Sequence, residues 1–485
     1  TVGRPVKIVL ARDEVFVTLT EPGVWIRIKT AVSRDGRLLG REIEAVLDTG
    51  AYADITVRLA RGVGLTAAGP YRIPHLAVDV SAVYTNKPPA GALRGVMIRQ
   101  LCWAYEQEMD QIAEHLGIDP IGMRMQNLLA TGDAMHTGET LQAVGVRECL
   151  ERVQAELDRH PIPAPLAGGA HPTVRARGVA CFIKHTMTPA LSLADVHLED
   201  DGSLTVRVGS VEMGQGMSTA LAQIAADAMG LPLGQVSLVF ADTSSSPYDQ
   251  GTNSSRAVFH MGRAIVEGTA RLQKDLLARA SELLEVSPTD LEIRDGYLAV
   301  RGHPDSRLGF GEIVKRVFGR GGGSLHARGM SKADAYLDRQ TGQGKGSTYY
   351  FTGAAGCEVE VDRETGAFRV LRYVAANNVG KAINPMLCAA QIEGAAVMGL
   401  SQTFFEALRW DNGQPLNPNL ADYPLASIRE APPVEVVLVE IPHPEGPFGA
   451  IGAGEPGIVP TSAAIGNAVA RALGARVFDL PLTPD

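Results

Sequence analysis

Cysteines are few in this sequence, and none is spaced for a metal ion or an iron–sulfur cluster. The five among 485 residues are Cys102, Cys149, Cys181, Cys357 and Cys388. Because no two of them form a Cys-x-x-Cys pair, the sequence gives neither a disulfide framework nor an iron–sulfur motif. We therefore expect free thiols in a reducing compartment, which places the protein in the cytoplasm.

Runs of basic residues and long apolar segments are also missing. The formal net charge of −9 argues against a surface for nucleic acid or for an acidic membrane. No apolar stretch has the length of a membrane span. No P-loop occurs, and His185, His197 and His260 stand apart without metal-ligand spacing. We therefore expect no nucleic-acid partner, no membrane and no metal ion held by side chains.

The chain is long enough to form two domains, and one stretch is typical of a linker. Hydrophobic residues make up 45% of the 485, enough for one large core or two. Residues 161–173 are rich in Pro, Ala and Gly, a composition that favours an exposed connection. We predict domains at residues 1–160 and 174–485.

Strand patterns and helix patterns are mixed along the chain, which indicates an α+β fold. Ser218 and Asn384 are of the types that cap helix N-termini, and a helix-like pattern follows each. We predict strands near residues 6–10, 25–30, 42–47, 190–198 and 236–240, and helices near 97–116, 219–229 and from 385 onward.

Residues 447–460 hold a single carboxylate, Glu455, among several glycines. Glycines such as Gly452 and Gly454 let a backbone come close to a ligand, and a helix-like pattern begins at Thr461. The N–H groups at a helix start attract anions. This stretch alone fits two interpretations equally well: an acid beside a bound group, or a tight turn with an incidental Glu.

Three loops rich in glycine or polar residues run into helix starts, at residues 213–216, 250–255 and 452–457, and Arg94 lies in a further Pro/Gly loop. Backbone amides in such loops suit a ligand with phosphate and many acceptors. The spacing Gly-x-Gly-x-x-Gly at 452–457 follows a loop and not a strand, so it is a weak dinucleotide signal. If a metal takes part, a cofactor must supply its ligands.

Five segments, taken in order, carry a resemblance to a known family. They are Pro-Pro-Ala-Gly-Ala-Leu-Arg-Gly at 88–95, Glu-Met-Gly-Gln-Gly at 212–216, Ile-Asn-Pro at 383–385 with Gln-Ile-Glu-Gly at 391–394, Gly-Glu-Pro-Gly at 454–457, and Leu-Pro-Leu-Thr-Pro at 480–484. Together they resemble the molybdenum hydroxylases, the xanthine dehydrogenase and aldehyde oxidase family, over essentially the whole chain. The fold that this resemblance implies is two elongated mixed α/β domains with a molybdopterin cofactor at their interface.

The resemblance also implies a set of site residues. It implies a molybdenum atom held by a pterin dithiolene, in the cytosine dinucleotide form that is frequent in bacteria. At matching positions, Glu455 is the catalytic base and Arg94 is the arginine near the metal. The implied cofactor-binding residues are Gly91, Ala92, Gly95, Gly214, Gln215, Gly216, Thr252, Ser254, Ser255, Gln391, Gly452 and Gly454, and Val96 and Lys184 are implied for the substrate pocket.

The implied reaction places oxygen from water on the carbon of an aldehyde or an N-heteroaromatic ring, with Glu455 accepting a proton. Electrons that leave molybdenum need a one-electron relay. The cysteines here cannot provide it, so we expect [2Fe-2S] clusters on partner subunits, and the resemblance implies FAD there as well. Two alternatives stay open: a cofactor-binding scaffold subunit without turnover, and a reductase of an aromatic thioester that uses the same site.

Several family features are missing. The Gly-Gly-x-Phe-Gly-Gly loop and the hammerhead domain before it do not occur, so we expect the C-terminal part of a split or shortened large subunit, with the rest on another subunit or segment. Val96 stands where purine-oxidising members have Phe, and Gly62 stands near the place of their purine-anchoring Arg, although Arg61 adjoins it. The Cys that carbon monoxide dehydrogenases place in the Arg94 loop is absent too. We expect neither a purine nor carbon monoxide as substrate.

Overall fold

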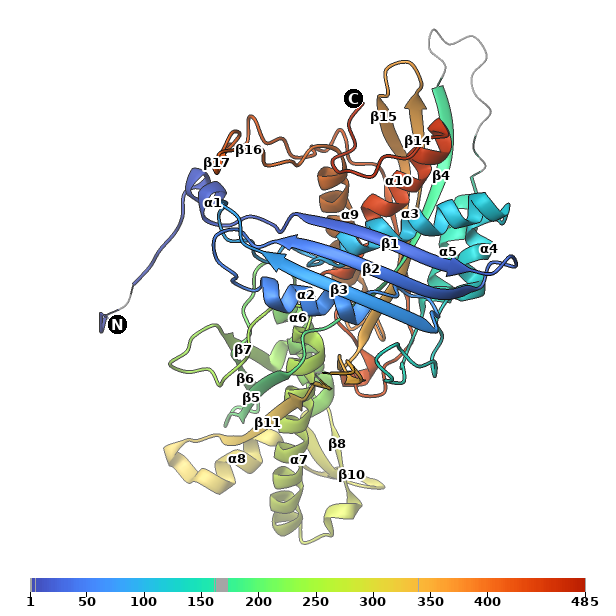
Figure 1. Ribbon diagram of the computed structural model, residues 1–485. Helices are drawn as coiled ribbons and strands as arrows, with labels where there is room; N and C mark the ends of the chain where they lie inside the picture. The colour runs from blue at the N-terminus through green and yellow to red at the C-terminus, as the bar shows by residue number, and fades with distance from the viewer. Residues whose placement is uncertain (1, 5, 161, 163–172, 339, 485) are drawn as a thin grey trace.

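The computed structural model describes residues 2–4, 6–160, 162, 173–338 and 340–484, and these residues form two lobes (Figure 1). The smaller lobe, green to yellow in Figure 1, lies below the larger one and follows β4 along the chain. Each lobe has its own cluster of buried apolar side chains. No helix in the described ranges combines the length and the apolarity needed to cross a membrane.

The first sheet of the larger lobe is formed by β1 (Val24–Val32), β2 (Leu38–Asp48) and β3 (His75–Val83). β1 and β2 are antiparallel across the turn at Gly36, whose φ of 86° favours glycine, and α2 (Thr56–Thr66) connects β2 to the parallel β3. These strands confirm the predictions near 25–30 and 42–47. The strand predicted near 6–10 is wrong: Val6 and Ile8 are exposed, and no described strand pairs with this segment.

The second sheet of the larger lobe has the order β18-β15-β14-β4. Helices cover both of its faces, because Gly178 on β4 faces α10 and Gly356 on β14 faces α5. A Cβ at Gly178 would lie 2.2 Å from the Ala464 carbonyl oxygen, so glycine lets this helix lie directly on the strand. The elements are β4 (Thr173–His185), β14 (Tyr350–Asp362), β15 (Phe368–Asn378), β18 (Val434–Val439), α5 (Val146–Asp158), α9 (Pro385–Phe404) and α10 (Thr461–Leu473).

Shorter elements complete the larger lobe. α3 (Ile98–Leu116) packs between the first sheet and α10, which confirms the helix predicted near 97–116. The others are α1 (Arg12–Thr18), α4 (Pro120–Asn127), β12 (Tyr336–Leu337), β13 (Gly344–Lys345), β16 (Trp410–Asp411), β17 (Gln414–Pro415) and the 3-10 turns η5 (Pro447–Gly449) and η6 (Pro456–Ile458).

The smaller lobe packs two helices on a sheet of order β11-β5-β6-β7. Its strands are β5 (Ala190–Leu198), β6 (Leu204–Val208), β7 (Val236–Phe240) and β11 (Leu325–Ala333). Its α-helices are α6 (Met217–Met229), α7 (Gly262–Leu284) and α8 (Phe310–Phe318), and the short π-helix η2 (Ala257–Met261) directly precedes α7. A hairpin sheet of β8 (Leu291–Arg294), β9 (Tyr297–Val300) and β10 (His303–Gly309) lies beside them, with the 3-10 turns η1 (Leu233–Gln235), η3 (Pro288–Asp290) and η4 (Gly319–Gly321). The strands predicted at 190–198 and 236–240 are confirmed.

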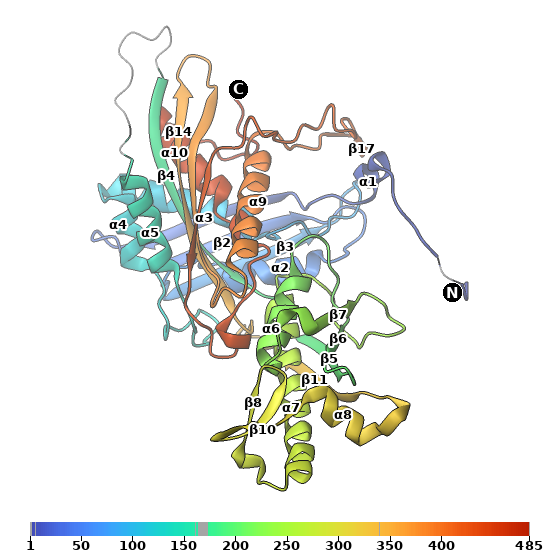
Figure 2. The same cartoon turned by 180° about the vertical axis from the view of Figure 1, so that it is seen from behind.

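One of the two predicted helix caps is confirmed. The Asn384 side chain accepts a hydrogen bond of 3.1 Å from the Leu387 N–H and caps α9. The Ser218 prediction is wrong, because α6 already begins at Met217 and the Glu212 carboxylate accepts from the Ser218 N–H at 2.8 Å. Figure 2 shows α6 at the top of the smaller lobe, below α9, and Asn384 donates to Gln223 of α6 at 3.1 Å.

The cores divide the chain differently from the proposed linker. The larger core takes residues from both sides of 161–173, such as Tyr105 and Cys181, and the smaller core spans Ala194 to Leu325. Residues 161 and 163–172 lie outside the described residues. The boundary at 161–173 therefore stays a prediction about where two sequence domains meet. The two cores instead divide the described residues into a larger lobe and a smaller lobe.

A fully buried ion cluster joins segments on both sides of that boundary. Arg124 donates to Glu106 at 2.8 Å and to Asp110 at 2.6 Å, and all three side chains are completely buried. Glu106 also accepts from the Cys181 N–H of β4 at 3.0 Å and from Tyr71. Because every charge in the cluster has a partner, losing one member leaves an unpaired buried charge.

We predict that Arg124→Met lowers the free energy of unfolding by about 3–5 kcal/mol, since it leaves the buried Glu106 carboxylate without a cation, whereas Asp110 keeps the Arg471 guanidinium at 3.1 Å. Urea denaturation followed by circular dichroism measures this loss. The control is Arg316→Met, which removes an exposed pair with Glu312 on α8 and should cost at most about 1 kcal/mol. Equal losses for the two variants would contradict the prediction.

Candidate functional site

A cavity of about 590 Å³ lies where loops of the two lobes meet. It brings together segments that are far apart in the sequence: the Arg94 loop, the start of α6, the loop at 252–258, the first turns of α9 and the glycine-rich stretch at 451–455. Thirteen of the sixteen predicted site residues line it: Ala92, Arg94, Val96, Gly214, Gln215, Gly216, Thr252, Ser254, Ser255, Gln391, Gly452, Gly454 and Glu455.

The Glu455 carboxylate is held on one side only. Its Oε2 accepts from Lys184 Nζ at 3.0 Å and from Ser255 Oγ at 2.9 Å. Among the described residues, no group donates to Oε1. Glu455 lines the cavity, and its side chain is 13% exposed. Oε1 is therefore the carboxylate oxygen left for a ligand.

Ser254 and Ser255 hold their loop in an uncommon backbone conformation. Their φ angles are 49° and 56°, in the left-handed region that non-glycine residues rarely adopt. Hydrogen bonds fix both residues: Ser254 Oγ accepts from Met187 N–H, and the Ser255 carbonyl accepts from Tyr349 OH at 3.0 Å. Ser255 Oγ also accepts from the Glu455 N–H at 2.9 Å, so backbone and side chain of Glu455 are fixed by one residue.

Arg94 connects two walls of the cavity. Its Nε donates to the Gly454 carbonyl at 2.6 Å, and its terminal nitrogen donates to the Gln391 carbonyl and side-chain oxygen at 2.8 and 2.9 Å. Burial lowers the pKa of the Arg94 guanidinium, and the negative charge of Glu455 partly offsets this. Arg94 therefore places a desolvated positive charge beside the loop that carries Glu455.

The loop before α6 is occupied by a carboxylate of the chain itself. Glu212 accepts from the N–H groups of Gly214, Gly216 and Ser218 at 2.8–3.1 Å. These amides lower the pKa of Glu212 against the opposing effect of burial. The sequence indicated that these amides would face a phosphate, whereas the structure gives them to Glu212 and leaves Gln215 at the cavity wall.

The other three predicted site residues lie behind the cavity wall. A Cβ at Gly91 would meet Leu19, and one at Gly95 would meet Ile458 at 2.7 Å, so both glycines serve close packing. Lys184 is 2% exposed and contacts the cavity only through Glu455. Their predicted roles toward cofactor and substrate stay predictions.

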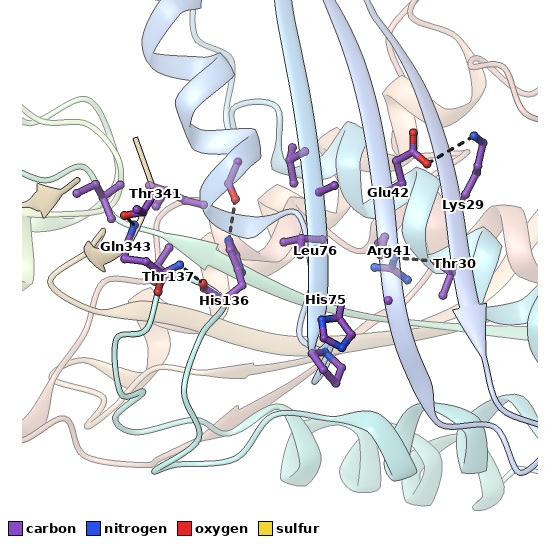
Figure 3. A pocket seen from close by; sticks show the side chains of 18 of the residues that line it. Lys29, Thr30, Arg41, Glu42, His75, Leu76, His136, Thr137, Thr341 and Gln343 are labelled. Atoms are coloured by element: carbon purple, nitrogen blue, oxygen red, sulfur yellow. Dashed lines mark hydrogen bonds and ion pairs between the residues drawn. The ribbon is translucent and has the colours of Figure 1, made fainter. Parts of the chain in front are cut away.

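A second, larger cavity of about 1050 Å³ lies on the face of the first sheet and shares no lining residue with the Glu455 cavity. Figure 3 shows Lys29 and Glu42 paired on one side, and His136 and Gln343 on the other. His136 bonds to the Gly64 carbonyl at 2.8 Å, and burial lowers its pKa. Arg61 lines this second cavity, so it does not replace a substrate-anchoring arginine in the Glu455 cavity.

Comparison with known families decides the type of site. Models of the molybdopterin cofactor-binding domain match residues 1–128 and 149–432. The chain belongs to the molybdenum hydroxylase family. Both domain models match, so the chain contains sequence of both cofactor-binding domains.

The chain is similar to several molybdenum hydroxylase subunits of greater length. It is 31% identical to the xanthine dehydrogenase molybdenum-binding subunit of Escherichia coli O157:H7, over 99% of this chain and 64% of that protein. Quinoline 2-oxidoreductase from Pseudomonas putida 86 has a TM-score of 0.86 at 26% identity, over 98% of this chain and 63% of that one. The aldehyde oxidoreductase from Desulfovibrio gigas has a TM-score of 0.81 at 26% identity, over 95% of this chain and 48% of that one. The chain thus spans less than two thirds of the length of these relatives.

The cavity fits a molybdopterin-type ligand. Glu455 is the one carboxylate among its lining residues, and Arg94 brings a positive charge that suits a phosphate-bearing group, whereas Arg256 and Lys381 are paired with Asp249 and Glu440. Gly452 lets two loops of the wall approach closely, because a Cβ there would lie 1.9 Å from the Ser255 carbonyl oxygen. No group of three or more His, Cys, Asp or Glu side chains in the described residues could hold a metal ion, so a molybdenum atom would take its ligands from the cofactor.

Sequence reasoning missed several lining residues. Lys381 lines the cavity and pairs with Glu440 at 3.0 Å, and Cys388 is a partly buried free thiol on α9, whose pKa burial raises. Both belong to the segment that carries the Asn384 cap. The Asn384 cap marks the start of a helix in the sequence. Because helix starts are frequent ligand-binding positions, this signal could have pointed to the residues around it.

We predict that Gly452→Ala lowers the molybdenum content of the assembled protein severalfold. The added Cβ would overlap the Ser255 carbonyl and displace the loop that forms one wall. Elemental analysis measures molybdenum per protein, and circular dichroism checks the fold. The matched control is Gly234→Ala, where a Cβ meets no atom within 4 Å and the content should stay at the parent level. Full molybdenum content in Gly452→Ala would refute the prediction.

Proposed function

We propose that this chain is the molybdenum-cofactor-binding, catalytic part of an oxidoreductase that hydroxylates an aldehyde or an N-heteroaromatic carbon with oxygen from water. One observation carries the proposal: a carboxylate with one anchored and one open oxygen faces a cavity that glycine loops and Arg94 enclose. An anchored carboxylate is suited to accept a proton in a fixed direction.

Each residue has a separate part in the proposed reaction. The molybdenum cofactor, when bound, supplies oxygen transfer and two-electron redox chemistry. Glu455 accepts at Oε1 the proton of the oxygen that water supplies. Arg94 keeps the Gly454 backbone and Gln391 in place, and its charge favours the negative charge that develops nearby. Gln215, Thr252 and Ser254 would hold the cofactor at the opposite walls.

The substrate class rests on the walls around Val96. No aromatic side chain is among the residues that line the cavity, so this part of the chain offers no ring for stacking a purine. By resemblance, Gly62 stands near the place of the purine-anchoring arginine, and a Cβ there would lie 2.8 Å from the His185 ring. Two of the similar structures are named for quinoline and for an aldehyde. We therefore propose a smaller or less polar substrate than a purine.

The cofactor form and the partners belong to the same proposal. A cytosine dinucleotide form would extend from the cavity along the loops that carry Gln215 and Thr252. The similarity to a protein named as a molybdenum-binding subunit supports additional subunits. We propose an iron–sulfur subunit, a flavin subunit and the remainder of the large subunit as partners, in the cytoplasm, where the five free cysteines would stay reduced.

We predict that Glu455→Gln lowers kcat by roughly 10²–10⁴-fold, since the amide keeps the size and hydrogen bonding of the carboxylate but cannot accept a proton. Molybdenum content should stay at the parent level. Steady-state kinetics on the assembled protein, with an aldehyde and with quinoline, measure the effect. Glu455→Asp should keep a small part of the activity.

Parent-level turnover by Glu455→Gln with full metal would sink the proposed role. That result would favour the alternative in which this chain binds cofactor without taking part in turnover, and Glu455 would be a turn residue held by Lys184 and Ser255.

We predict that the native complex contains iron and acid-labile sulfide at about two of each per [2Fe-2S] cluster, none of it on this chain. The cysteines of this chain are scattered and four of them are buried, so they cannot ligate a cluster. Metal analysis and mass spectrometry of the purified complex measure the content and the subunits. An active complex without iron would contradict the proposed electron path.

A further inference from the structure

The Lys184 ammonium group is buried against groups of the protein itself. It lies on β4 and is 2% exposed. Its Nζ donates to Glu455 Oε2 at 3.0 Å and to the His185 carbonyl at 3.2 Å, and it lies 5.0 Å from the centre of the Phe351 ring. Two of its three N–H donors have acceptors in the protein, and because Lys184 does not line the cavity, its ammonium does not face a substrate there.

We propose that Lys184 is a positioning residue whose charge pairs with the Glu455 carboxylate and whose N–H group fixes Oε2, so that Oε1 alone faces the cavity. The inference rests on the proposed role of Glu455 as the base. It replaces the expectation that Lys184 contacts the substrate with a role exerted through Glu455.

The geometry gives each donor a distinct task. Ser255 is neutral and sits on the strained loop of the smaller lobe, so it fixes direction without charge. Lys184 comes from β4, the last strand in the order of the second sheet of the larger lobe, and brings a full positive charge to the same oxygen. Two donors on one oxygen remove the freedom of the carboxylate to rotate, and the open oxygen then has one orientation.

Three ionisable groups face Glu455. Lys184 forms the direct ion pair, with side chains 3% and 13% exposed. Arg94 interacts with the Glu455 charge but gives its hydrogen bonds to Gly454 and Gln391. Tyr349 is buried, and burial raises the pKa of its hydroxyl, which keeps it neutral. Lys184 is therefore the cation whose loss most disfavours the ionised carboxylate, and the poor screening of a buried pair enlarges that effect.

The sign of the effect follows from the charge. A cation in contact stabilises the carboxylate form, so the group stays able to accept a proton at lower pH. Without Lys184 the largely buried carboxyl group loses the cation that favours its charged form. The acid limb of the pH profile should then move to higher pH. Below this limb, each pH unit of the shift lowers the rate about tenfold.

The test uses Lys184→Met in the assembled, molybdenum-loaded protein. The acid limb of the kcat/KM profile should move up by at least one pH unit, while molybdenum content stays at the parent level. A second readout does not depend on activity: a water-soluble carbodiimide with an added amine labels protonated carboxyl groups, and peptide mass spectrometry reports labelling at Glu455 across pH 5–8, a range chosen to bracket the limb. Labelling should extend to higher pH in Lys184→Met than in the parent.

Two further variants separate charge from structure. Lys184→Gln keeps a neutral donor toward Oε2, so it should show the same pH shift with a smaller loss of kcat at the optimum, and it serves as the test protein if Lys184→Met does not fold. Lys332→Met is the matched control, because Lys332 is 60% exposed and pairs with the exposed Asp334 at 3.2 Å. It should leave both readouts unchanged.

The outcomes distinguish this inference from the proposed function. If Glu455→Gln abolishes turnover while Lys184→Met keeps the parent pH profile and the parent labelling of Glu455, Lys184 is a packing residue and the inference is overturned. If Glu455→Gln itself turns over at the parent rate, the proposed function fails first. A pH shift and extended labelling in both Lys184 variants, with none in Lys332→Met, is the result we expect.

Discussion

A single carboxylate oxygen is the point on which the site depends. Glu455 Oε2 joins Lys184 of the larger lobe to Ser255 of the smaller lobe, residues separated from it by 271 and 200 positions in the sequence. The same Ser255 accepts from the Glu455 N–H and carries a carbonyl that touches Tyr349. Because these groups are poorly exposed, each hydrogen bond is strong and leaving any of them unmade is costly.

The loop that supplies Ser255 is itself held by a buried ion pair. Arg256 donates to Asp249 at 2.8 Å and to the carbonyls of Gly251 and Leu191 at 3.0 Å, and both charged side chains are almost fully buried. A loop fixed in this way can keep two neighbouring residues at positive φ, an arrangement that would relax in a free segment. The strain at Ser254 and Ser255 is therefore maintained by the smaller lobe, where it directs a hydroxyl across to Glu455.

Local chemistry was readable from the sequence, and long-range partners were not. Glycine runs and a lone acid have meaning within a few residues, so Glu455, Gly452 and the loop before α6 were predicted at the cavity they do line. Lys184 lies in an apolar strand pattern, and nothing local indicates a carboxylate partner 271 residues later. The strand predicted near 6–10 failed for a related reason, since alternation specifies a face but a strand also needs a neighbour.

Competition between side chains explains the remaining differences. Ser218 has the chemistry of a cap, but Glu212 has a longer side chain and reaches three amides at once, which a hydroxyl cannot do. This arrangement gives the loop before α6 its shape without any ligand. The Gln215 side chain is held in the same loop, since it accepts from the Met213 N–H at 2.7 Å and donates to the Val211 carbonyl at 3.1 Å. The chain's own hydrogen bonds therefore fix both walls of the cavity, the loop before α6 and the loops around Glu455, and a ligand site with a defined geometry requires walls that are held in this way.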